Sequence, residues 1–185
     1  MPGINPTSPR YSSGIAGYYC CRDALCVLRV RLSFRMPQSL SRVLLHVVFS
    51  TKHREPFLME ELRPKLYGYL ASVGREMGCQ IYRIGGVADH VHLAVELSRT
   101  VTIADLVKKL KETSSAWVKG QPGAPRDFEW QAGYGVFSIG QSQLEDLLKY
   151  IDGQEEHHRV KSFQEEYLTF LARYGIKPHE RYVLD

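Results

Sequence analysis

The stretch CQIYRIGGVADHVHLAVEL, residues 79–97, decides the fold. It contains two short apolar runs joined by a brief Gly-Val-Ala link, a pattern typical of a β-hairpin. Upstream, RVLLHVVFS at residues 42–50 is a β-branched apolar run that predicts a buried strand. Downstream, FEWQAGYGVFSIG at residues 128–140 is aromatic and interrupted by glycines, which predicts a bent fourth strand.

Segments with helical spacing of apolar residues separate and follow these strands. Thr102 is a candidate N-cap, and Ser142 with Glu145 has the spacing of a capping box. The helices are expected at residues 59–77, 102–118, 142–158 and 163–174. The first six elements have the order β-α-β-β-α-β. This order predicts an α+β fold with a ferredoxin-like or RRM-like sheet and additional C-terminal helices.

Composition and charge set limits on the class of protein. The chain has 185 residues, of which 44% are hydrophobic and 24% are charged, as in ordinary globular proteins. No apolar run reaches the roughly 20 residues that a membrane span needs. The net charge of +4 comes from residues 1–35, which contain five arginines and one acidic residue, Asp23. The other residues carry 19 basic and 19 acidic groups. Any nucleic-acid binding by residues 36–185 must therefore come from local patches of basic residues.

Residues 1–35 differ from the rest of the chain in composition. They are rich in Pro, Gly and Ser at the start, and they contain Cys20, Cys21 and Cys26, whose spacing is not that of a zinc site. We expect an unstructured extension, or a segment translated from upstream of a natural start at Met36. Residues 36–185 are then the functional domain. The single cysteine of this body, Cys79, suits a cytosolic, reducing compartment.

His90 and His92 are the first candidate functional residues. Alternation along a strand directs both side chains to one face and those of Val91 and Leu93 to the other. Two imidazoles at this spacing can reach one divalent cation. The alternative is two half-exposed histidines at a sheet edge.

Tyr150 and Gln154 are the second candidate pair. They lie four residues apart on the expected helix and share a face, and His157 or His158 extends this polar stripe. The structural alternative is a tyrosine ring that packs at the rim of the core. A cation held by two histidines and an amide oxygen can bind a phosphate and hold its phosphorus in line with a phenol. Attack by tyrosine would then leave a phosphotyrosine and a free 3′-hydroxyl.

Five segments of the chain resemble the small single-tyrosine HUH transposases of the IS200-like insertion-sequence family, which include REP-associated relatives. They are MPQSLSRVLLHVVFSTKHREPF from Met36, GGVADHVHLAVELS, ADLVKKLKETSS-W, WQAGYGVFS and YIDGQEEHH. The resemblance implies that Tyr150 is the nucleophile and that His90, His92 and Gln154 are metal ligands. It also implies a Mg²⁺ or Mn²⁺ cofactor, a homodimer, and a prokaryotic cytoplasmic, nucleoid-associated location. The implied substrate is single-stranded DNA with hairpin ends, cut and joined through a 5′-phosphotyrosine.

Basic residues suggest where DNA could be contacted. Lys52 and Arg54 follow the first strand, and Lys108, Lys109 and Lys111 lie close together on the second long helix. For the three helix lysines, the alternative is that they are exposed to solvent and have no DNA partner.

Two other functions remain open on the sequence. One is a non-catalytic single-stranded nucleic-acid-binding module with an RRM-like sheet, although no RNP-type aromatic motif occurs on any expected strand. The other is an HUH replication or relaxase-type nickase, although the chain leaves no room for the further domains such enzymes often carry.

Overall fold

The computed structural model describes residues 40–160 and 162–177. The expected extension at residues 1–35 lies outside this part. The strands are β1 (Leu44–Ser50), β2 (Gln80–Gly86), β3 (His90–Glu96) and β4 (Gly135–Ile139). The helices are α1 (Arg63–Glu76), α2 (Ile103–Lys119), α3 (Leu144–Asp152), α4 (Gln154–His157) and α5 (Phe163–Arg173), with short 3-10 turns η1 (Lys52–Arg54) and η2 (Gln141–Gln143).

The four strands form one sheet in the order β2-β3-β1-β4, with antiparallel neighbours throughout. This is the predicted ferredoxin-like arrangement, and β2 and β3 form the predicted hairpin. β3 lies inside the sheet between β2 and β1, where His92 pairs with Val48 and Ala94 with His46. Both edges of β3 are therefore occupied by neighbouring strands.

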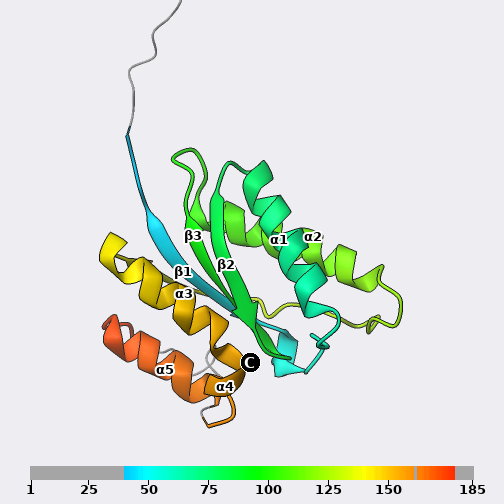
Figure 1. The fold of residues 1–185 in the computed structure, drawn as a ribbon. Helices are drawn as coiled ribbons and strands as arrows, with labels where there is room; N and C mark the ends of the chain where they lie inside the picture. Colours follow the sequence, from blue (N-terminus) through cyan, green and yellow to red (C-terminus); the bar gives the residue numbers. More distant parts are fainter. Residues whose placement is uncertain (1–39, 161, 178–185) are drawn as a thin grey trace, which may run out of the picture. The chain divides into compact units, whose positions relative to one another are not determined.

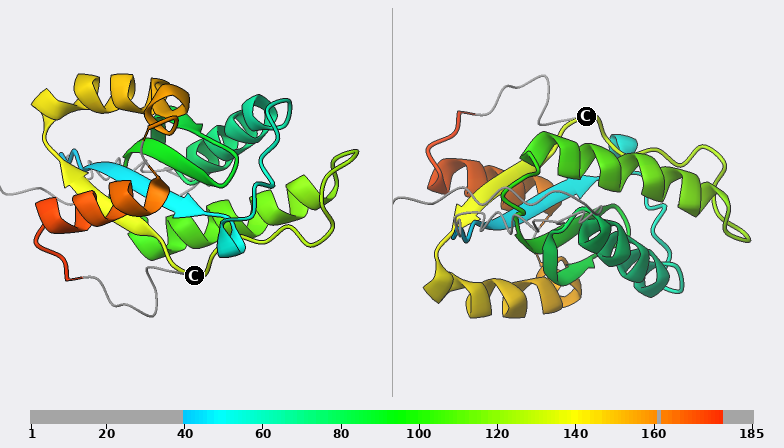
Figure 2. Two further views of the ribbon diagram at one scale, coloured as in Figure 1. Left: turned by 90° about the horizontal axis from the view of Figure 1, so that it is seen from below. Right: turned by 90° about the horizontal axis from the view of Figure 1, so that it is seen from above.

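The helices form two layers on opposite faces of the sheet (Figures 1 and 2). α1 and α2 cover the face on which Val91, Leu93 and Val95 belong to the main hydrophobic core. α3, α4 and α5 cover the other face, where Ala94 packs with α3 and Val48 with α5. A strand buried on both faces explains why β1 and β3 read as nearly continuous apolar runs.

The helix expected at residues 142–158 is divided by Gly153 into α3 and α4. The Ser142–Glu145 capping box was a wrong prediction, because the chain already turns at Gln141. The Gln143 side-chain oxygen accepts a hydrogen bond from the Gly140 backbone N–H at 2.8 Å instead. The Thr102 cap is confirmed, since its hydroxyl accepts from the Asp105 N–H at 3.0 Å.

The fourth strand is shorter than the segment that predicted it, since β4 contains only its last third. Upstream, Trp130 forms an isolated bridge to Thr51 and packs its ring into the core beside Phe49. Before Gly135, a single bridge and the packing of the Trp130 ring thus take the place of continuous strand pairing.

Gly85 sets how closely α3 approaches the sheet. A Cβ added at this position would lie 2.5 Å from the Ile151 carbonyl oxygen, a distance that real side chains do not show. The missing side chain lets the end of α3 rest directly on β2. Tyr150, the residue before Ile151, is thereby held next to β3.

Among the residues described, no helix combines the length and apolar character needed to cross a membrane.

Candidate metal and tyrosine site

His90 and His92 lie on β3 beneath the layer formed by α3, α4 and α5. Both are fully buried, with 0% of their surface exposed. The predicted common face is correct, and the alternative of half-exposed edge histidines is wrong because β3 is an inner strand under helices.

Each of these histidines has one ring nitrogen bound by a neighbour. His90 Nδ1 lies 2.7 Å from Asp89 Oδ1, and His92 Nδ1 lies 2.8 Å from His46 Nε2. With the proton on Nδ1, each ring donates to its neighbour and presents a lone pair on Nε2. Such an outer contact is the usual way in which proteins orient a histidine toward a metal.

The two Nε2 atoms are buried and form no hydrogen bond to any described residue. Burial lowers the pKa of His92 well below its ordinary value, with the neighbouring histidines adding to the effect. Burial also lowers the pKa of His46 to about 4. The rings of His92 and His46 are thus neutral at pH 7, and neutral imidazole is the form that binds a cation. Unpaired buried nitrogens are costly in a folded protein, so this donor set fits a divalent cation.

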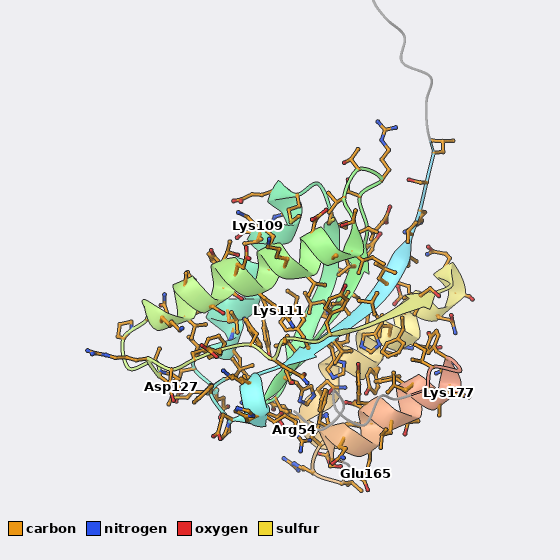
Figure 3. The ribbon with its side chains drawn as sticks, turned by 180° about the vertical axis from the view of Figure 1, so that it is seen from behind. Arg54, Lys109, Lys111, Asp127, Glu165 and Lys177 are labelled. Carbon is orange, nitrogen blue, oxygen red and sulfur yellow. The ribbon has the colours of Figure 1, made fainter. Side chains whose placement is uncertain are left out.

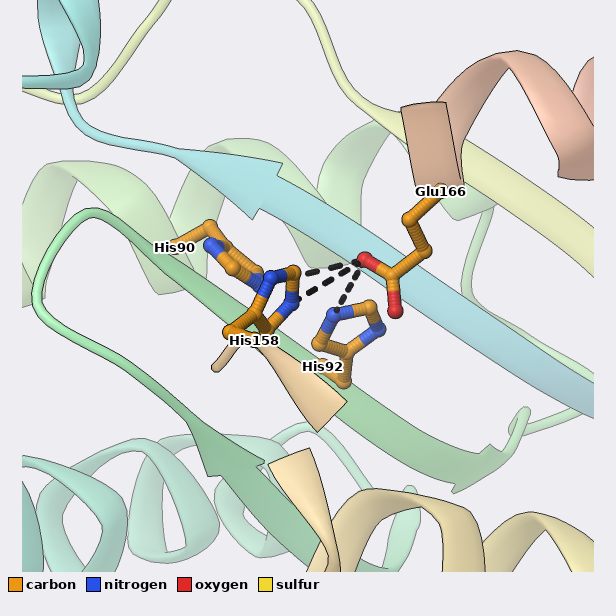
Figure 4. Close-up of side chains that lie close together, drawn as sticks. All are labelled: His90, His92, His158 and Glu166. Atoms are coloured by element: carbon orange, nitrogen blue, oxygen red, sulfur yellow. Dashed lines mark ion pairs between the residues drawn. The ribbon is translucent and has the colours of Figure 1, made fainter. Parts of the chain in front are cut away.

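A carboxylate that the sequence analysis did not consider completes the cluster. Glu166 on α5 directs Oε2 toward the Nε2 atoms of three histidines (Figure 4). The separations are 3.4 Å to His158, 3.5 Å to His92 and 4.0 Å to His90. One donor atom from each of these four residues lies within 4.8 Å of every other. Burial, followed by the charge of Asp89, raises the pKa of Glu166 to about 8.

Gln154 is fully buried at the start of α4 and contacts the same group. Its Oε1 lies 3.1 Å from His158 Nε2, and its Nε2 donates to Glu166 Oε1 at 3.4 Å. Gln154 therefore contacts two members of the cluster, His158 and Glu166. Its amide oxygen faces His158.

Tyr150 lies on α3 with its ring beside the histidines. The ring centroids of Tyr150 and His92 are 5.8 Å apart, and the two rings meet edge to face. The phenolic oxygen is buried and has no hydrogen-bond partner in the described ranges. The ring also borders a cavity of about 320 Å³ that is lined in part by Phe170 and Arg173 of α5 and by Tyr174, which directly follows this helix.

Of the basic residues proposed for DNA contact, Arg54 lies close enough to this cluster for its charge to help lower the pKa of Asp89. Lys109 and Lys111 lie on α2 and Arg54 after β1, as the view from behind shows (Figure 3). Lys52 pairs with Glu129 at 2.5 Å and Lys108 with Glu112 at 3.9 Å. The Lys111 ammonium donates to the carbonyl oxygens of Gln131 and Gly133 and is partly buried.

Three members of the cluster were missed as functional residues, although the sequence contains a signal for each. His46 interrupts an otherwise apolar strand, and Asp89 directly precedes the histidine motif. Glu166 lies three residues after Phe163 and four before Phe170, on the apolar face of α5. An acidic residue on such a face needs a partner within the fold.

The comparisons with known proteins agree on one family. A profile described as "Transposase IS200 like" matches residues 39–154, more than half of the chain. The ISDra2 transposase TnpA of Deinococcus radiodurans is 23% identical over 116 residues, which cover 60% of this chain and 83% of the relative. A solved REP-associated tyrosine transposase bound to a REP hairpin has the same fold. Its TM-score is 0.51 at 13% identity, with 66% of this chain and 73% of that chain covered. The protein therefore belongs to the IS200-like transposase family, which gives it a DNA-cleaving role in transposition.

Proposed function

We propose that this protein cleaves and rejoins single-stranded DNA at the hairpin-bearing ends of a mobile element. The covalent intermediate is a 5′-phosphotyrosine on Tyr150, and the reaction depends on Mg²⁺ or Mn²⁺. The observation that carries this proposal is the edge-to-face contact of the Tyr150 ring with His92, 5.8 Å between centroids. It brings the only tyrosine of α3 to the two buried histidines whose Nε2 atoms lack partners among the described side chains.

The reaction is a transesterification. The Tyr150 oxygen forms a bond to the phosphorus of the scissile phosphate, and the bond from phosphorus to the 3′ oxygen breaks. The phenol loses its proton, and the departing strand takes one up to leave as a free 3′-hydroxyl. The phosphate ester stays on Tyr150, so its bond energy is available for rejoining the strand without ATP.

The chain's own residues prepare this step. His90 and His92 would hold the divalent ion, with Asp89 and His46 fixing their rings through Nδ1. An ion held by these residues would supply positive charge that offsets the charge of the phosphate and helps to orient it. Gln154, the ligand implied by the family resemblance, adjoins this group through His158 and Glu166.

The DNA substrate and the assembly of the protein are the remaining parts of the proposed function. The REP-associated neighbour was solved with a hairpin, which supports a DNA hairpin as the ligand here. The basic groups proposed to contact the DNA backbone are Lys52, Arg54, Lys108, Lys109 and Lys111. The histidines and Tyr150 adjoin within one chain, so a homodimer would not need to exchange α3 to assemble the site.

A covalent-adduct assay tests the proposal. Full-length protein, Mn²⁺ and labelled single-stranded hairpin DNA are expected to give a labelled protein band on a denaturing gel. Tyr150→Phe abolishes the band and leaves DNA binding near normal, whereas Tyr134→Phe, on an exposed tyrosine outside the cluster, leaves the band unchanged. His90→Ala loses both the band and most of the Mn²⁺ affinity. A band that persists in Tyr150→Phe would assign the nucleophile elsewhere.

A further inference from the structure

The carboxylate of Glu166 lies where a third metal ligand would be needed. Two histidines from one strand leave most of the coordination shell of a divalent ion open. Glu166 reaches this opening from α5, with only 3% of its side chain exposed. Its Oε2 lies 3.5 Å from His92 Nε2 and 4.0 Å from His90 Nε2.

These separations fit ligand atoms that share one metal ion better than atoms that form a hydrogen bond to each other. Charge-assisted N–H···O bonds are about 2.7–2.9 Å long, much shorter than either distance. Two atoms that each lie about 2.1 Å from one ion are about 3.0 Å apart at a right angle and about 4.2 Å apart when opposite. Glu166 Oε2 and both histidine Nε2 atoms also lack hydrogen bonds within the described part of the chain.

We propose that Glu166 is a direct ligand of the divalent ion, so that the set is His90, His92 and Glu166. This inference rests on the proposed metal-dependent function and changes its third ligand. Two imidazoles and one carboxylate on one side of an ion leave positions open for phosphate oxygens and water. The mixed donor set also favours Mn²⁺ over Mg²⁺, because Mg²⁺ prefers oxygen ligands alone.

In this arrangement Gln154 is a positioning residue. Its Oε1 faces His158 Nε2 at 3.1 Å, and its Nε2 donates to the second carboxylate oxygen of Glu166 at 3.4 Å. The amide thus holds the carboxylate while Oε2 remains directed at His90 and His92. Such outer contacts orient a ligand without touching the ion.

None of the comparisons supplies this assignment. The family profile ends at Gln154, and α5 begins at Phe163. Glu166 is recognised only because α5 lies across the histidine face of the sheet and buries its carboxylate there. Metal binding would then also link α5, which carries Glu166, to β3, which carries His90 and His92.

Mn²⁺ titration of the metal-stripped full chain, followed by the electron paramagnetic resonance of free Mn²⁺, tests the proposal without DNA. Glu166→Gln keeps the size of the side chain and is expected to weaken Mn²⁺ affinity at least tenfold. Glu166→Asp keeps the carboxylate and is expected to retain more affinity than Glu166→Gln. Gln154→Met loses less affinity than Glu166→Gln. The matched control Glu156→Gln removes an exposed carboxylate that pairs with Arg159 and leaves affinity unchanged.

Three results would overturn the assignment. If Gln154→Met loses Mn²⁺ affinity while Glu166→Gln keeps it, the amide is the third ligand. If Glu166→Gln keeps its affinity and forms more DNA adduct, the carboxylate shields the histidines from phosphate. If Glu166→Asp binds no better than Glu166→Gln, the carboxylate does not contact the ion. By contrast, wild-type Mn²⁺ affinity in a His90→Ala variant would contradict the metal site of the proposed function itself.

Discussion

His46 Nε2 and His92 Nδ1 lie 2.8 Å apart across the neighbouring strands β1 and β3. Both side chains are buried, at 3% and 0% exposure, and their rings stack at 24°. The contact fixes the rotation of the His92 ring, so its Nε2 faces Glu166. The position of the proposed ligand therefore depends on a residue from another strand.

Substitution of His46 tests this dependence. His46→Phe fills the same space and removes the partner of His92 Nδ1, and it is expected to weaken Mn²⁺ affinity roughly 10- to 100-fold, as loss of an outer-shell contact does. His46→Gln offers an amide to His92 and is expected to recover part of the affinity. Calorimetric titration with Mn²⁺ measures both variants. Equal affinity in His46→Phe and wild type would show that His92 needs no such support.

Tyr150→Phe is expected to stabilise the metal-free protein. The phenolic oxygen is buried without a partner in the described residues, and an unsatisfied buried hydroxyl costs about 1–3 kcal/mol. Tyr174→Phe is the contrasting variant, since its hydroxyl donates to the Ser138 carbonyl at 2.8 Å and its loss lowers stability. Urea unfolding at pH 7 measures the free energies. A lower unfolding free energy for Tyr150→Phe would mean that its hydroxyl has a partner in solution.

The fold was largely predictable from the sequence, and the site only in part. Apolar runs and helical spacing predicted the sheet and its hairpin, because burial on both faces of β1 and β3 leaves a strong pattern. The His-x-His spacing predicted a shared face, since side chains alternate along a strand. Glu166 and His46 come from elements far away in the chain. No local spacing relates them to His92, so their contact follows only from how α5 and β1 pack.

Lys111 predicts a pH dependence of stability away from the site. Burial lowers its pKa to about 8 from the ordinary value of 10.5, so the folded state gives up this proton earlier than the unfolded state. Between about pH 8 and 10.5 the unfolded chain binds more protons, and the contribution of Lys111 to stability rises with pH. The free energy of unfolding of wild type, minus that of Lys111→Met, is expected to increase from pH 7.5 to pH 10. Urea unfolding curves at both values check this, and a constant difference would contradict the lowered pKa.

Lys108 and Lys109 are exposed on α2 and test the proposed DNA contacts. If both contact phosphates, the double variant Lys108→Ala, Lys109→Ala binds single-stranded hairpin DNA more weakly. The slope of log affinity against log salt is then expected to fall in magnitude by about 1.4, since each contact to a single strand contributes about 0.7. Fluorescence anisotropy at several salt concentrations gives the slope. The exposed Lys65→Ala of α1 is a control for the loss of positive charge, and an unchanged slope in the double variant would leave these lysines as solvated residues.

The buried phenol of Tyr150 requires a movement before DNA can reach it. Its ring lies 5.9 Å from that of Phe170 on α5 and 5.5 Å from that of His157 on α4, as measured between centroids. A scissile phosphate therefore contacts the phenolic oxygen only after α4 or α5 shifts. We expect backbone amides of α4 and α5 to exchange with deuterium faster than those of α2 in the metal-free protein, because local opening there exposes less buried surface. If Glu166 binds the ion, Mn²⁺ slows exchange in α5 in wild type and has less effect in Glu166→Gln. Exchange in α5 as slow as in the inner strand β1 would instead require α3 itself to carry Tyr150 out to the DNA.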